Sequence, residues 1–383
     1  MLIAIHMLKN YPSTNLNRDD TGTPKCCMFG EVLRSRISSQ CIKNFIRKSP
    51  FFKKGISDNY IGVRTRKLPD LVCESLRKDG ISEDYLEVVK KRLTGFANKD
   101  NKENDKGITS QVIIYSHEDI DAVVHVMKDL IESAGSFKEF EKIKSKDMEA
   151  KLKDAKTRPV SVDIALFGRM VTSDAFADVD ASMQVAHAFS VNKAVLESDF
   201  FTAMDDLVDG KEDAGSGMMG DIDYVSSCYY SYFSLDVDKL RENLKNSPDV
   251  DQIIEKVIPV LIRSIAFCNP CGKQNSFAGN VLPSAMLIEC KDFPVPVSYA
   301  NAFVKPVRAT SSNDLVEESV NRLAKYVVGL DKSFSLLLLK RFWFCAGLEN
   351  KVELPVKEDG IVSNYENFED MLNAISDFVS ANK

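Results

Sequence analysis

The chain contains 383 residues, enough for one large domain or two ordinary ones with a substantial core. Hydrophobic residues make up 44% and charged residues 28%, as in ordinary globular proteins, and the apolar runs are far shorter than a membrane span, which excludes an integral membrane protein. The net charge of −6, taken alone, argues against a nucleic-acid-binding protein.

The start of the chain reads as a strand that belongs to the fold. Residues 1–6 lack the charged region and the small-residue cleavage site of a signal peptide. We therefore expect a cytoplasmic protein with no membrane partner.

The nine cysteines are scattered, which is typical of a reducing compartment and not of a disulfide framework. Cys268 and Cys271 have the spacing of half a zinc site, and Cys290 follows at a distance. A structural zinc site needs four ligands, and the four histidines show no ligand spacing with these cysteines. We interpret the cysteines as free thiols and expect neither a metal nor another cofactor.

The first third of the chain combines strands and helices. Residues 2–8 predict a strand that is buried on both faces, and the turn-forming residues 11–15 predict a loop. A strand over 34–38 leads into a helix over 39–48, which ends before Pro50. Residues 58–156 read as mostly helical and highly charged.

The middle of the chain is less regular. Residues 98–107 predict a polar loop and 112–115 a short apolar stretch, both interrupting the helical region. An apolar, strand-like pattern covers 161–170, and 181–189 reads as helical. Residues 191–225 are acidic and rich in glycine with few core positions, and segments of this kind are usually functional or disordered.

The last third again alternates between helix and strand. A helix is predicted from Ser247, with an apolar side and a kink at Pro259. Strand and turn follow over 283–302, a helix over 313–328, and an apolar strand over 334–345. The lack of a regular strand–helix–strand repeat indicates the α+β class.

Basic residues are concentrated near the N-terminus, while the acids lie mostly elsewhere. Between positions 25 and 54 only Glu31 is acidic. The eight basic residues of this stretch are Lys25, Arg34, Arg36, Lys43, Arg47, Lys48, Lys53 and Lys54. This asymmetry favours one basic surface on an otherwise acidic protein, although charge alone fits a solvated helix face equally well.

The order of residues within this stretch suits phosphate groups. Arg34, Arg36 and Ser38 fall on one face of the predicted strand. A helix that begins at Ser39 adds free backbone N–H groups next to the serine hydroxyls, which together form an anion site. The alternative is that Ser39 serves only as an N-cap.

Lys43 and Arg47 extend the donors along the helix. They lie four residues apart and therefore share a face. The alternative is that the pair forms only a solvent-exposed face without function. Taken together, the strip offers phosphate donors with no catalytic pairing.

Six segments of the chain resemble, in the same order, the CasC (Cse-four-type) family of the RAMP superfamily, the repeated subunit of type I-E CRISPR Cascade. Their shared order over residues 2–308 argues against coincidence, whereas 58–156 and the tail beyond 310 match weakly. The segments are Asn17–Lys43, with Asn-Arg-Asp-Asp and Arg-Ile-Ser-Ser-Gln; Val162–Met170; Val179–Ala188; Asp199–Leu207; Lys273–Ser276; and Ala300–Phe303.

The resemblance implies a fold with three parts. A palm like the RNA-recognition motif (ferredoxin-like) would comprise residues 1–57, 157–190 and 226–383. A helical fingers domain would be inserted over 58–156, and a protruding thumb hairpin would cover 191–225. The class remains α+β.

The resemblance also implies a function without catalysis. Several copies would polymerise along one guide crRNA, kink it at regular intervals with their thumbs, and present it for pairing with target DNA. The implied partners are crRNA, target DNA through the guide, further copies of the chain, and Cascade subunits of the CasA, CasB, CasD and CasE types. Such a subunit binds RNA without reading its sequence, which needs backbone charge and an apolar wedge.

The residues that the resemblance and the strip assign to RNA fall into four groups. Met170 and Thr172 would insert near the RNA, Phe201 and Thr202 would lie beside the kinked base, and Lys273 and Gln274 belong to a matching segment. The backbone-binding group is Arg18, Lys25, Arg34, Arg36, Ser38, Gln40, Lys43 and Arg47.

Three features depart from the family pattern. Phe200 replaces the usual tryptophan, which keeps a stacking face but loses an N–H donor. Asn275 stands where an arginine is expected, so a phosphate contact there does not carry over. The divergent helical insert transfers no contact with target DNA.

Two alternatives to this function stay open. Asp19 and Asp20 could hold Mg²⁺ in a metal-dependent ribonuclease, since a type III relative cuts RNA with an aspartate. Adjacent acids in an extended segment face opposite ways, however, which favours a salt link to a neighbouring arginine instead. A generic RNA-binding protein is the other alternative. His187 and Trp343 read as core residues, His187 on an apolar helix face.

Overall fold

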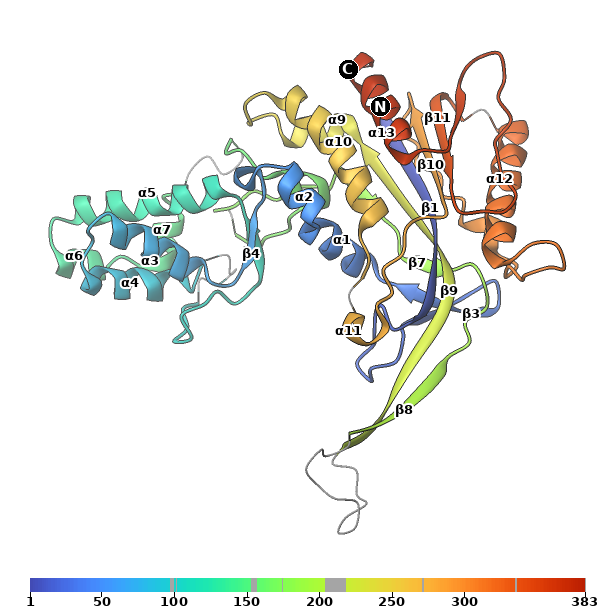
Figure 1. The fold of residues 1–383 in the computed structure, drawn as a ribbon. Coiled ribbons are helices and arrows are strands. Elements are labelled where there is room, and N and C mark those ends of the chain that lie inside the picture. The colour runs from blue at the N-terminus through green and yellow to red at the C-terminus, as the bar shows by residue number, and fades with distance from the viewer. Residues whose placement is uncertain are drawn as a thin grey trace, which may run out of the picture. The chain divides into compact units, whose positions relative to one another are not determined.

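The computed structural model describes residues 1–96, 100, 102–152, 157–173, 175–203, 218–270, 272–334 and 336–382 (Figure 1). The chain forms two compact units. The first, called here the sheet unit, comprises Met1–Phe52, Val185–Ser234 and Ile258–Lys383. The second, the helical unit, comprises Lys53–Gln184 and Leu235–Val257.

The sheet unit is built on one large, mostly antiparallel sheet with the strand order β12-β11-β10-β1-β9-β7-β3-β2. The pair β11–β12 is parallel. The strands are β1 (Leu2–Thr14), β2 (Cys26–Phe29), β3 (Val32–Ile37), β7 (Ala188–Ser190), β9 (Met218–Asp236), β10 (Ala285–Lys291), β11 (Leu338–Cys345) and β12 (Val362–Tyr365), with β8 (Glu197–Ala203) pairing only with β9 and a short β6 (Met183–Val185).

The central strand β1 is buried on both faces because helices cover both sides of the sheet (Figure 1). Ala4 and Leu8 belong to a core with α12 (Leu315–Ser333), whereas Met7 and Tyr11 face the opposite side, toward α1. The helices of this unit are α1 (Ser39–Lys48), the first half of α2 (Pro50–Gly55), the second half of α10 (Val250–Phe267), α11 (Gln274–Phe277), η2 (Ala300–Phe303), α12 and α13 (Phe368–Ala381).

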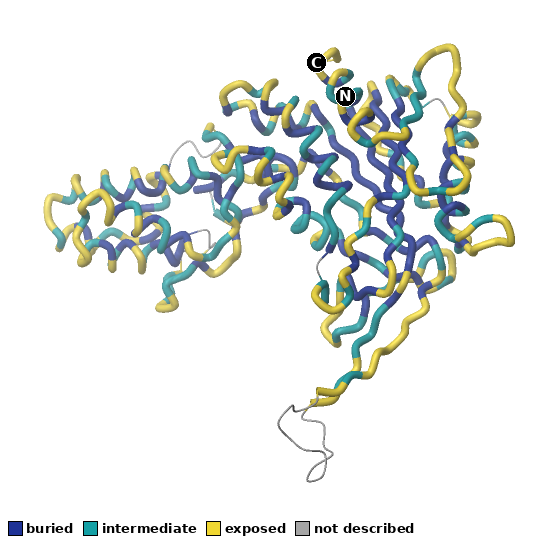
Figure 2. Tube along the Cα trace, viewed as in Figure 1, coloured by how far each residue is buried: buried dark blue, intermediate teal, exposed yellow. Residues whose placement is uncertain are grey.

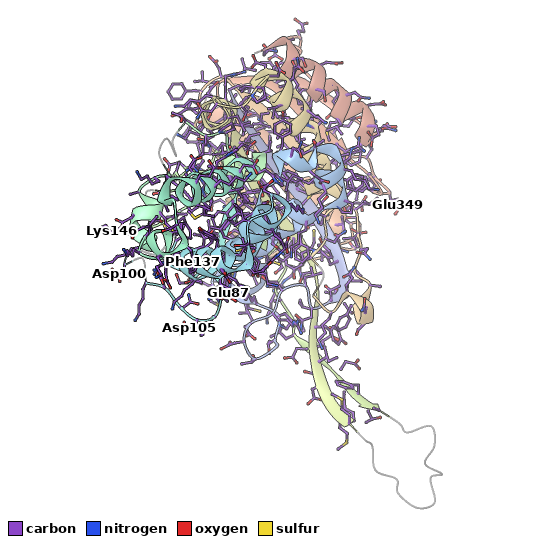
Figure 3. The ribbon with its side chains drawn as sticks, turned by 90° about the vertical axis from the view of Figure 1, so that its left-hand side faces the viewer. Glu87, Asp100, Asp105, Phe137, Lys146 and Glu349 are labelled. Carbon is purple, nitrogen blue, oxygen red and sulfur yellow. The ribbon has the colours of Figure 1, made fainter. Side chains whose placement is uncertain are left out.

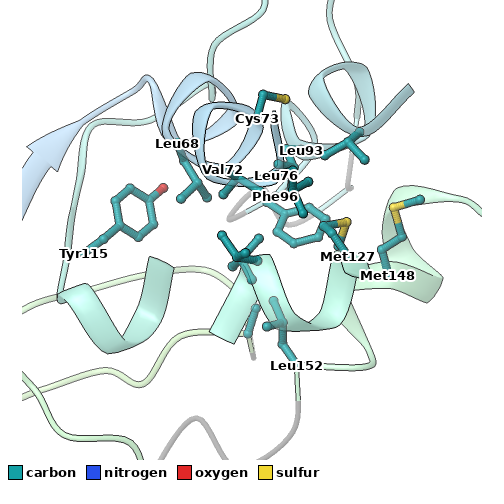
Figure 4. Packing of buried hydrophobic residues seen from close by; sticks show 14 of the residues in the cluster. Leu68, Val72, Cys73, Leu76, Leu93, Phe96, Tyr115, Met127, Met148 and Leu152 are labelled. Atoms are coloured by element: carbon teal, nitrogen blue, oxygen red, sulfur yellow. The ribbon is translucent and has the colours of Figure 1, made fainter. Parts of the chain in front are cut away.

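The helical unit has its own core. Apolar residues at helical spacing, such as Leu68, Val72 and Leu76 of α3, pack against Met127 of α5 and against Phe96 (Figure 4). The elements are η1 (Asp58–Tyr60), β4 (Val63–Thr65), α3 (Leu68–Lys78), α4 (Glu83–Leu93), β5 (Ile113–Tyr115), α5 (His117–Ala134), α6 (Phe137–Glu141), α7 (Ser145–Glu149), α8 (Val162–Phe167) and α9 (Val237–Asn243).

The surface of the helical unit is charged, as the sequence predicted for this region. Glu87, Asp105 and Lys146 are exposed on it (Figure 3). Its helix α5 begins with a capping box, in which the Ser116 hydroxyl accepts from the Asp119 N–H and the Asp119 carboxylate accepts from the Ser116 N–H. Across the described parts of the chain, no helix is long and apolar enough to cross a membrane.

Most predicted elements of the first and last thirds are confirmed. The helix over 39–48 is present as α1, and the strand over 34–38 is present as β3. The first strand is longer than predicted, because β1 continues through 11–14 with Tyr11 and Thr14 buried. The helix predicted from Ser247 begins at Val250 and contains Pro259.

Two predictions for the middle of the chain were wrong. Residues 161–170 contain the helix α8, in which five successive residues from Val162 are buried, so the pattern has no helical period to detect. Residues 181–189 contain the strands β6 and β7 in place of the predicted helix. A segment this short is decided by its pairing partners in the sheet and not by its own propensity.

The segment 191–225, predicted to be irregular, contains a β-hairpin. Strands β8 and β9 pair in antiparallel register from Glu197↔Tyr224 to Ala203↔Met218, and residues 204–217 lie outside the described part. The hairpin extends beyond the end of the sheet, and β8 is exposed except at Phe201, which is half-buried (Figure 2). Within the sheet unit it is therefore a protruding element with little core of its own.

Candidate nucleic-acid interface

The loop that carries Arg18 and Lys25 is fixed against the start of α1. The Asn17 side-chain oxygen accepts from the Ser38 N–H at 2.9 Å, and the Asn17 carbonyl accepts from the Lys25 N–H at 2.8 Å. The Lys25 carbonyl in turn accepts from the Arg36 N–H at 2.7 Å. These contacts place the segments that carry Arg18, Lys25, Arg36 and Ser38 next to one another.

Asp19 serves to shape this loop. One oxygen of its carboxylate accepts from the Thr21 N–H at 3.0 Å, the Thr21 hydroxyl at 2.7 Å and the Thr23 N–H at 3.0 Å. These hydrogen bonds, led by the Thr21 hydroxyl, lower the pKa of Asp19. Within the described ranges Asp19 forms hydrogen bonds with this loop and no salt link with an arginine, so the predicted salt link was wrong for this residue. Nor does this part of the chain contain a group of three potential ligands placed to hold a metal ion.

The N-terminus of α1 presents donors without a competing acid. The Ser38 hydroxyl caps the helix by accepting from the Cys41 N–H at 3.3 Å, and the first turn contains no acidic residue. Gln40 is exposed in this first turn, and Lys43 lies half-buried behind it. Burial lowers the pKa of Lys43, and no carboxylate offsets the effect. Arg47 is also half-buried, one turn further along the helix.

Arg34 is placed differently from the prediction. The strand buries it completely, and its guanidinium donates only to backbone carbonyl oxygens. The acceptors are those of Phe29, Ser190, Val191, Phe303 and Val304, at 2.6–3.3 Å. Because its donors are occupied in this way, Arg34 connects β3 to two other segments and is not part of the exposed basic surface. The prediction that it shares an exposed face with Arg36 and Ser38 was therefore wrong.

His187 is a residue that sequence reasoning placed wrongly. It is exposed directly before β7 and not buried on a helix, and its Nδ1 lies 2.7 Å from Nη1 of Arg36. Burial, Arg36 and Lys25 together lower its pKa. The strand β7 that follows His187 pairs with β3. The burial pattern of Ala188, Phe189 and Ser190 alternates as in a strand, and this alternation was the sequence signal that could have predicted it.

Lys273 and Gln274 lie beside the same loop. A Cβ added at Gly272 would come within 2.4 Å of the carbonyl oxygen of Asn15, which follows β1. The backbone at Gly272 is therefore in close contact with the backbone after β1. The ring centroid of Phe277 is 5.9 Å from that of Tyr224 on the hairpin. Both polar atoms of the Gln274 amide are shielded from solvent and have no hydrogen bond to the part of the protein that the structure describes.

The base of the hairpin is tied to this loop as well. The Thr23 hydroxyl donates to the Asp223 carboxylate at 2.8 Å, and the Asn15 amide donates to the Asp223 carbonyl at 2.7 Å. Further out, Phe200 is exposed, Phe201 is half-buried and Thr202 is exposed. The predicted wedge residues thus stand on an element anchored next to the basic loop.

Comparison with known proteins identifies the family. The sequence pattern of the CT1975-like protein family of Cas proteins matches residues 3–373. The chain belongs to this family. No curated protein matches it significantly.

Two solved structures resemble the chain along its whole length. A chain of a structure described as "CRISPR RNA-guided surveillance complex, pre-nicking" is 25% identical, with a TM-score of 0.81, and the match covers 99% of this chain and 100% of that one. A chain of a "CRISPR RNA-guided surveillance complex" is 22% identical, with a TM-score of 0.61 and complete coverage of both. The second likeness concerns the fold alone.

In this CT1975-like protein, Met170 and Thr172 belong to the helical unit, separate from the other predicted residues. Arg169 anchors their loop, because its guanidinium donates to the Ala177 carbonyl at 3.0 Å and to the Asp119 carboxylate at 2.5 Å. The next side chain, Met170, is 89% exposed.

The arrangement in the sheet unit is suited to binding an extended polyanion. It combines cations on the loop 17–25 and on α1, free N–H groups at a helix start, and aromatic rings on the hairpin. Two acids beside it, Asp19 and Asp223, accept hydrogen bonds from the threonine hydroxyls of the loop. Cations, N–H donors and aromatic rings are the groups that suit phosphates and bases.

Proposed function

We propose that the chain is a guide-RNA-binding backbone subunit of a Cascade-type CRISPR surveillance complex. The observation that carries the proposal is the end-to-end likeness to a subunit of an RNA-guided surveillance complex, at a TM-score of 0.81. The basic loop and α1 N-terminus supply the phosphate donors that such a subunit needs.

In this proposal several copies line up along one crRNA. The loop 17–25, α1 and Lys273 hold the RNA backbone, while the hairpin β8–β9, acting as a thumb, reaches to the next copy and displaces a base with Phe201. The guide bases that stay stacked pair with target DNA. The sheet unit then corresponds to an RNA-recognition-motif-like palm and the helical unit to fingers. The finer assignment to the type I-E CasC group, with subunits of the CasA, CasB, CasD and CasE types as partners, belongs to the same proposal.

The proposal treats the subunit as non-catalytic. Asp19, one of the two acids within the loop 17–25, uses one carboxylate oxygen to hold Thr21 and Thr23. This use favours a loop-shaping role over metal binding. The metal-dependent ribonuclease remains the second candidate, because Asp19 and Asp223 both lie next to the donors that would hold RNA.

Sequencing of copurifying RNA tests the proposal. The full chain is expressed with a CRISPR array and purified, and the bound RNA is sequenced. We expect spacer sequences flanked by repeat-derived ends. A random sample of cellular RNA would contradict the guide-specific role and favour a generic RNA-binding protein. Incubation of the purified chain with RNA and Mg²⁺ distinguishes the non-catalytic subunit from the metal-dependent ribonuclease. Only the ribonuclease is expected to cleave the RNA.

A further inference from the structure

The pair Arg36 and His187 is unusual in its partners. Arg36 on β3 donates from Nη1 to Nδ1 of His187 at 2.7 Å, next to the β3–β7 pairing of Arg36 with Phe189. An imidazole nitrogen that accepts from a guanidinium must be unprotonated, so His187 is neutral and carries its proton on Nε2. Unlike a carboxylate, this acceptor leaves the positive charge of Arg36 unneutralised.

Positive charge accumulates around His187. Lys25 and Arg36 both act on its pKa, and neither residue has an ion pair with a carboxylate in the described ranges. His187 is exposed, while Lys25 and Arg36 are half-buried, so all three remain open to a ligand from solvent. Three basic groups held together without an acid form a site that an anion would complete.

The other groups that face this cluster do not supply the missing charge. The thiols of Cys26 and Cys27 on β2 interact with Arg36, and burial raises the pKa of both, which keeps them neutral. Asp19 is ionised and lies near Cys26, but the groups that act on the pKa of His187 are Arg36 and Lys25 and do not include Asp19. The strand β7 contributes only Ala188, Phe189 and Ser190 beside His187.

We propose that Lys25, Arg36 and His187 form one phosphate-binding site and that a guide phosphate bound there brings a proton onto His187. This inference rests on the proposed function. The proton comes from solvent and adds to Nδ1, which turns this atom from an acceptor into a donor. The hydrogen bond with Arg36 then breaks, and both side chains donate to the phosphate oxygens.

Proton uptake makes guide binding depend on pH in a defined direction. In the free chain the pKa of His187 is lowered by burial and by its two cationic neighbours, and a phosphate dianion or monoanion beside it raises that pKa. RNA affinity therefore increases as the pH falls through the pKa of the bound state. It levels off once the pH is below the pKa of the free state, because both forms are then protonated.

The test measures affinity for a synthetic single-stranded guide RNA at constant ionic strength from about pH 5.5 to about pH 8.5, the range in which histidines titrate. For the wild type we expect an increase of up to about tenfold per pH unit over the sensitive range. In His187→Gln this slope is lost, and the affinity ratio of wild type to variant grows as the pH falls. In His187→Lys, which carries a permanent charge, the slope is lost while binding persists at high pH.

A direct readout separates charge from structure. NMR of the imidazole resonances, with His187→Gln identifying its signal among the four histidines, gives the pKa of His187 with and without the RNA. A higher pKa in the complex supports the site. An unchanged pKa, or a pH slope that survives in His187→Gln, overturns this inference while leaving RNA binding intact. Failure of the wild type to bind the guide at any pH overturns the proposed function as well.

Discussion

Phe201 on β8 lies directly opposite Gly220 on β9, and its ring covers the glycine. A Cβ added at Gly220 would come within 2.9 Å of two ring atoms of Phe201, so the ring occupies the space where a side chain would stand. An aromatic ring over a cross-strand glycine stabilises a hairpin that would otherwise have a gap. The neighbouring Phe200, opposite Asp221, points to the other face and is 62% exposed.

Phe201→Ala is expected to weaken assembly on the guide more than it weakens the fold. The ring lies on a protruding hairpin outside the main cores, whereas stacking on a base is worth roughly 1–3 kcal/mol, or about 5-fold to 150-fold in affinity. Guide-RNA binding and the melting temperature should both be measured on this variant. A large fall in melting temperature with unchanged RNA binding would mean that Phe201 acts only as packing.

Two matched variants accompany that measurement. Gly220→Ala keeps Phe201 but pushes its ring aside, so it should reproduce part of the loss of RNA binding. Phe200→Ala removes a ring of the same size from the opposite face of the same strand. If Phe200→Ala causes the larger loss in assembly, the wedge has been assigned to the wrong face of β8.

Lys43→Ala combined with Arg47→Ala should reduce the salt dependence of guide binding. Each phosphate contact to a single strand contributes about 0.7 to the slope of log affinity against log salt, so two contacts contribute between about one and two. The loss should be similar for guides of unrelated sequence, because phosphates carry no sequence information.

The control for charge is a second pair of basic residues, two lysines on the other side of the sheet. Lys325 and Lys332 are exposed on α12, which packs against the face of β1 opposite to α1. Their replacement by alanine removes two positive charges and should leave the slope nearly unchanged. Equal effects of the two double variants would indicate that net charge alone, and no located strip, attracts the RNA.

The sequence predicted the fold best where local signals and tertiary contacts agree. Helix α1 begins at Ser39 and ends before Pro50 as predicted, although its N-cap is Ser38 and not Ser39. The predicted α+β class and the predicted burial of Trp343 in the core are also confirmed. Helix α8 and strands β6 and β7 were missed because each has six or fewer residues and depends on partners far along the chain.

The candidate site could be predicted only in part. Residue types and spacing gave the cations of the loop and of α1, but alternation along a strand cannot tell which face lies inside. Arg34 is buried because two segments remote in sequence, 190–191 and 303–304, supply carbonyl oxygens around it, which no local pattern reveals. His187 joins Arg36 across 151 positions of sequence, so its role became visible only in the folded chain.

Asp19→Asn and Asp19→Ala should differ if the residue shapes the loop. Asparagine keeps a side-chain oxygen that accepts from Thr21 and Thr23, whereas alanine removes the acceptor and loosens the loop that carries Arg18. We expect guide affinity to fall in Asp19→Ala and to be largely retained in Asp19→Asn. A metal-binding carboxylate predicts instead that Mg²⁺-dependent RNA cleavage by the wild type is abolished equally in both variants.

Lys9 is buried in the sheet unit without a carboxylate partner. Its ammonium donates to the Cys268 carbonyl at 2.8 Å and approaches the Asn269 side-chain oxygen at 3.3 Å. It lines a cavity of about 30 Å³, room for one water molecule, among apolar side chains such as Ile46 and Ile265. Burial lowers the pKa of Lys9 to about 7.

Protein stability should therefore increase with pH on the alkaline side of neutrality. Between about pH 7, the pKa of Lys9 in the folded chain, and pH 10.5, its ordinary pKa, Lys9 is protonated in the unfolded chain but not in the folded chain. Because the unfolded state binds the extra proton, raising the pH over this range disfavours unfolding. Below about 7 both states are protonated and the penalty, roughly 3–5 kcal/mol, is constant. Lys9→Met removes the titrating group, so the free energy of unfolding should vary less between pH 7 and pH 9, which urea titrations at each pH can measure. Lys325→Met, at an exposed position, should keep the wild-type pH dependence, and the same dependence in Lys9→Met would show that Lys9 titrates normally.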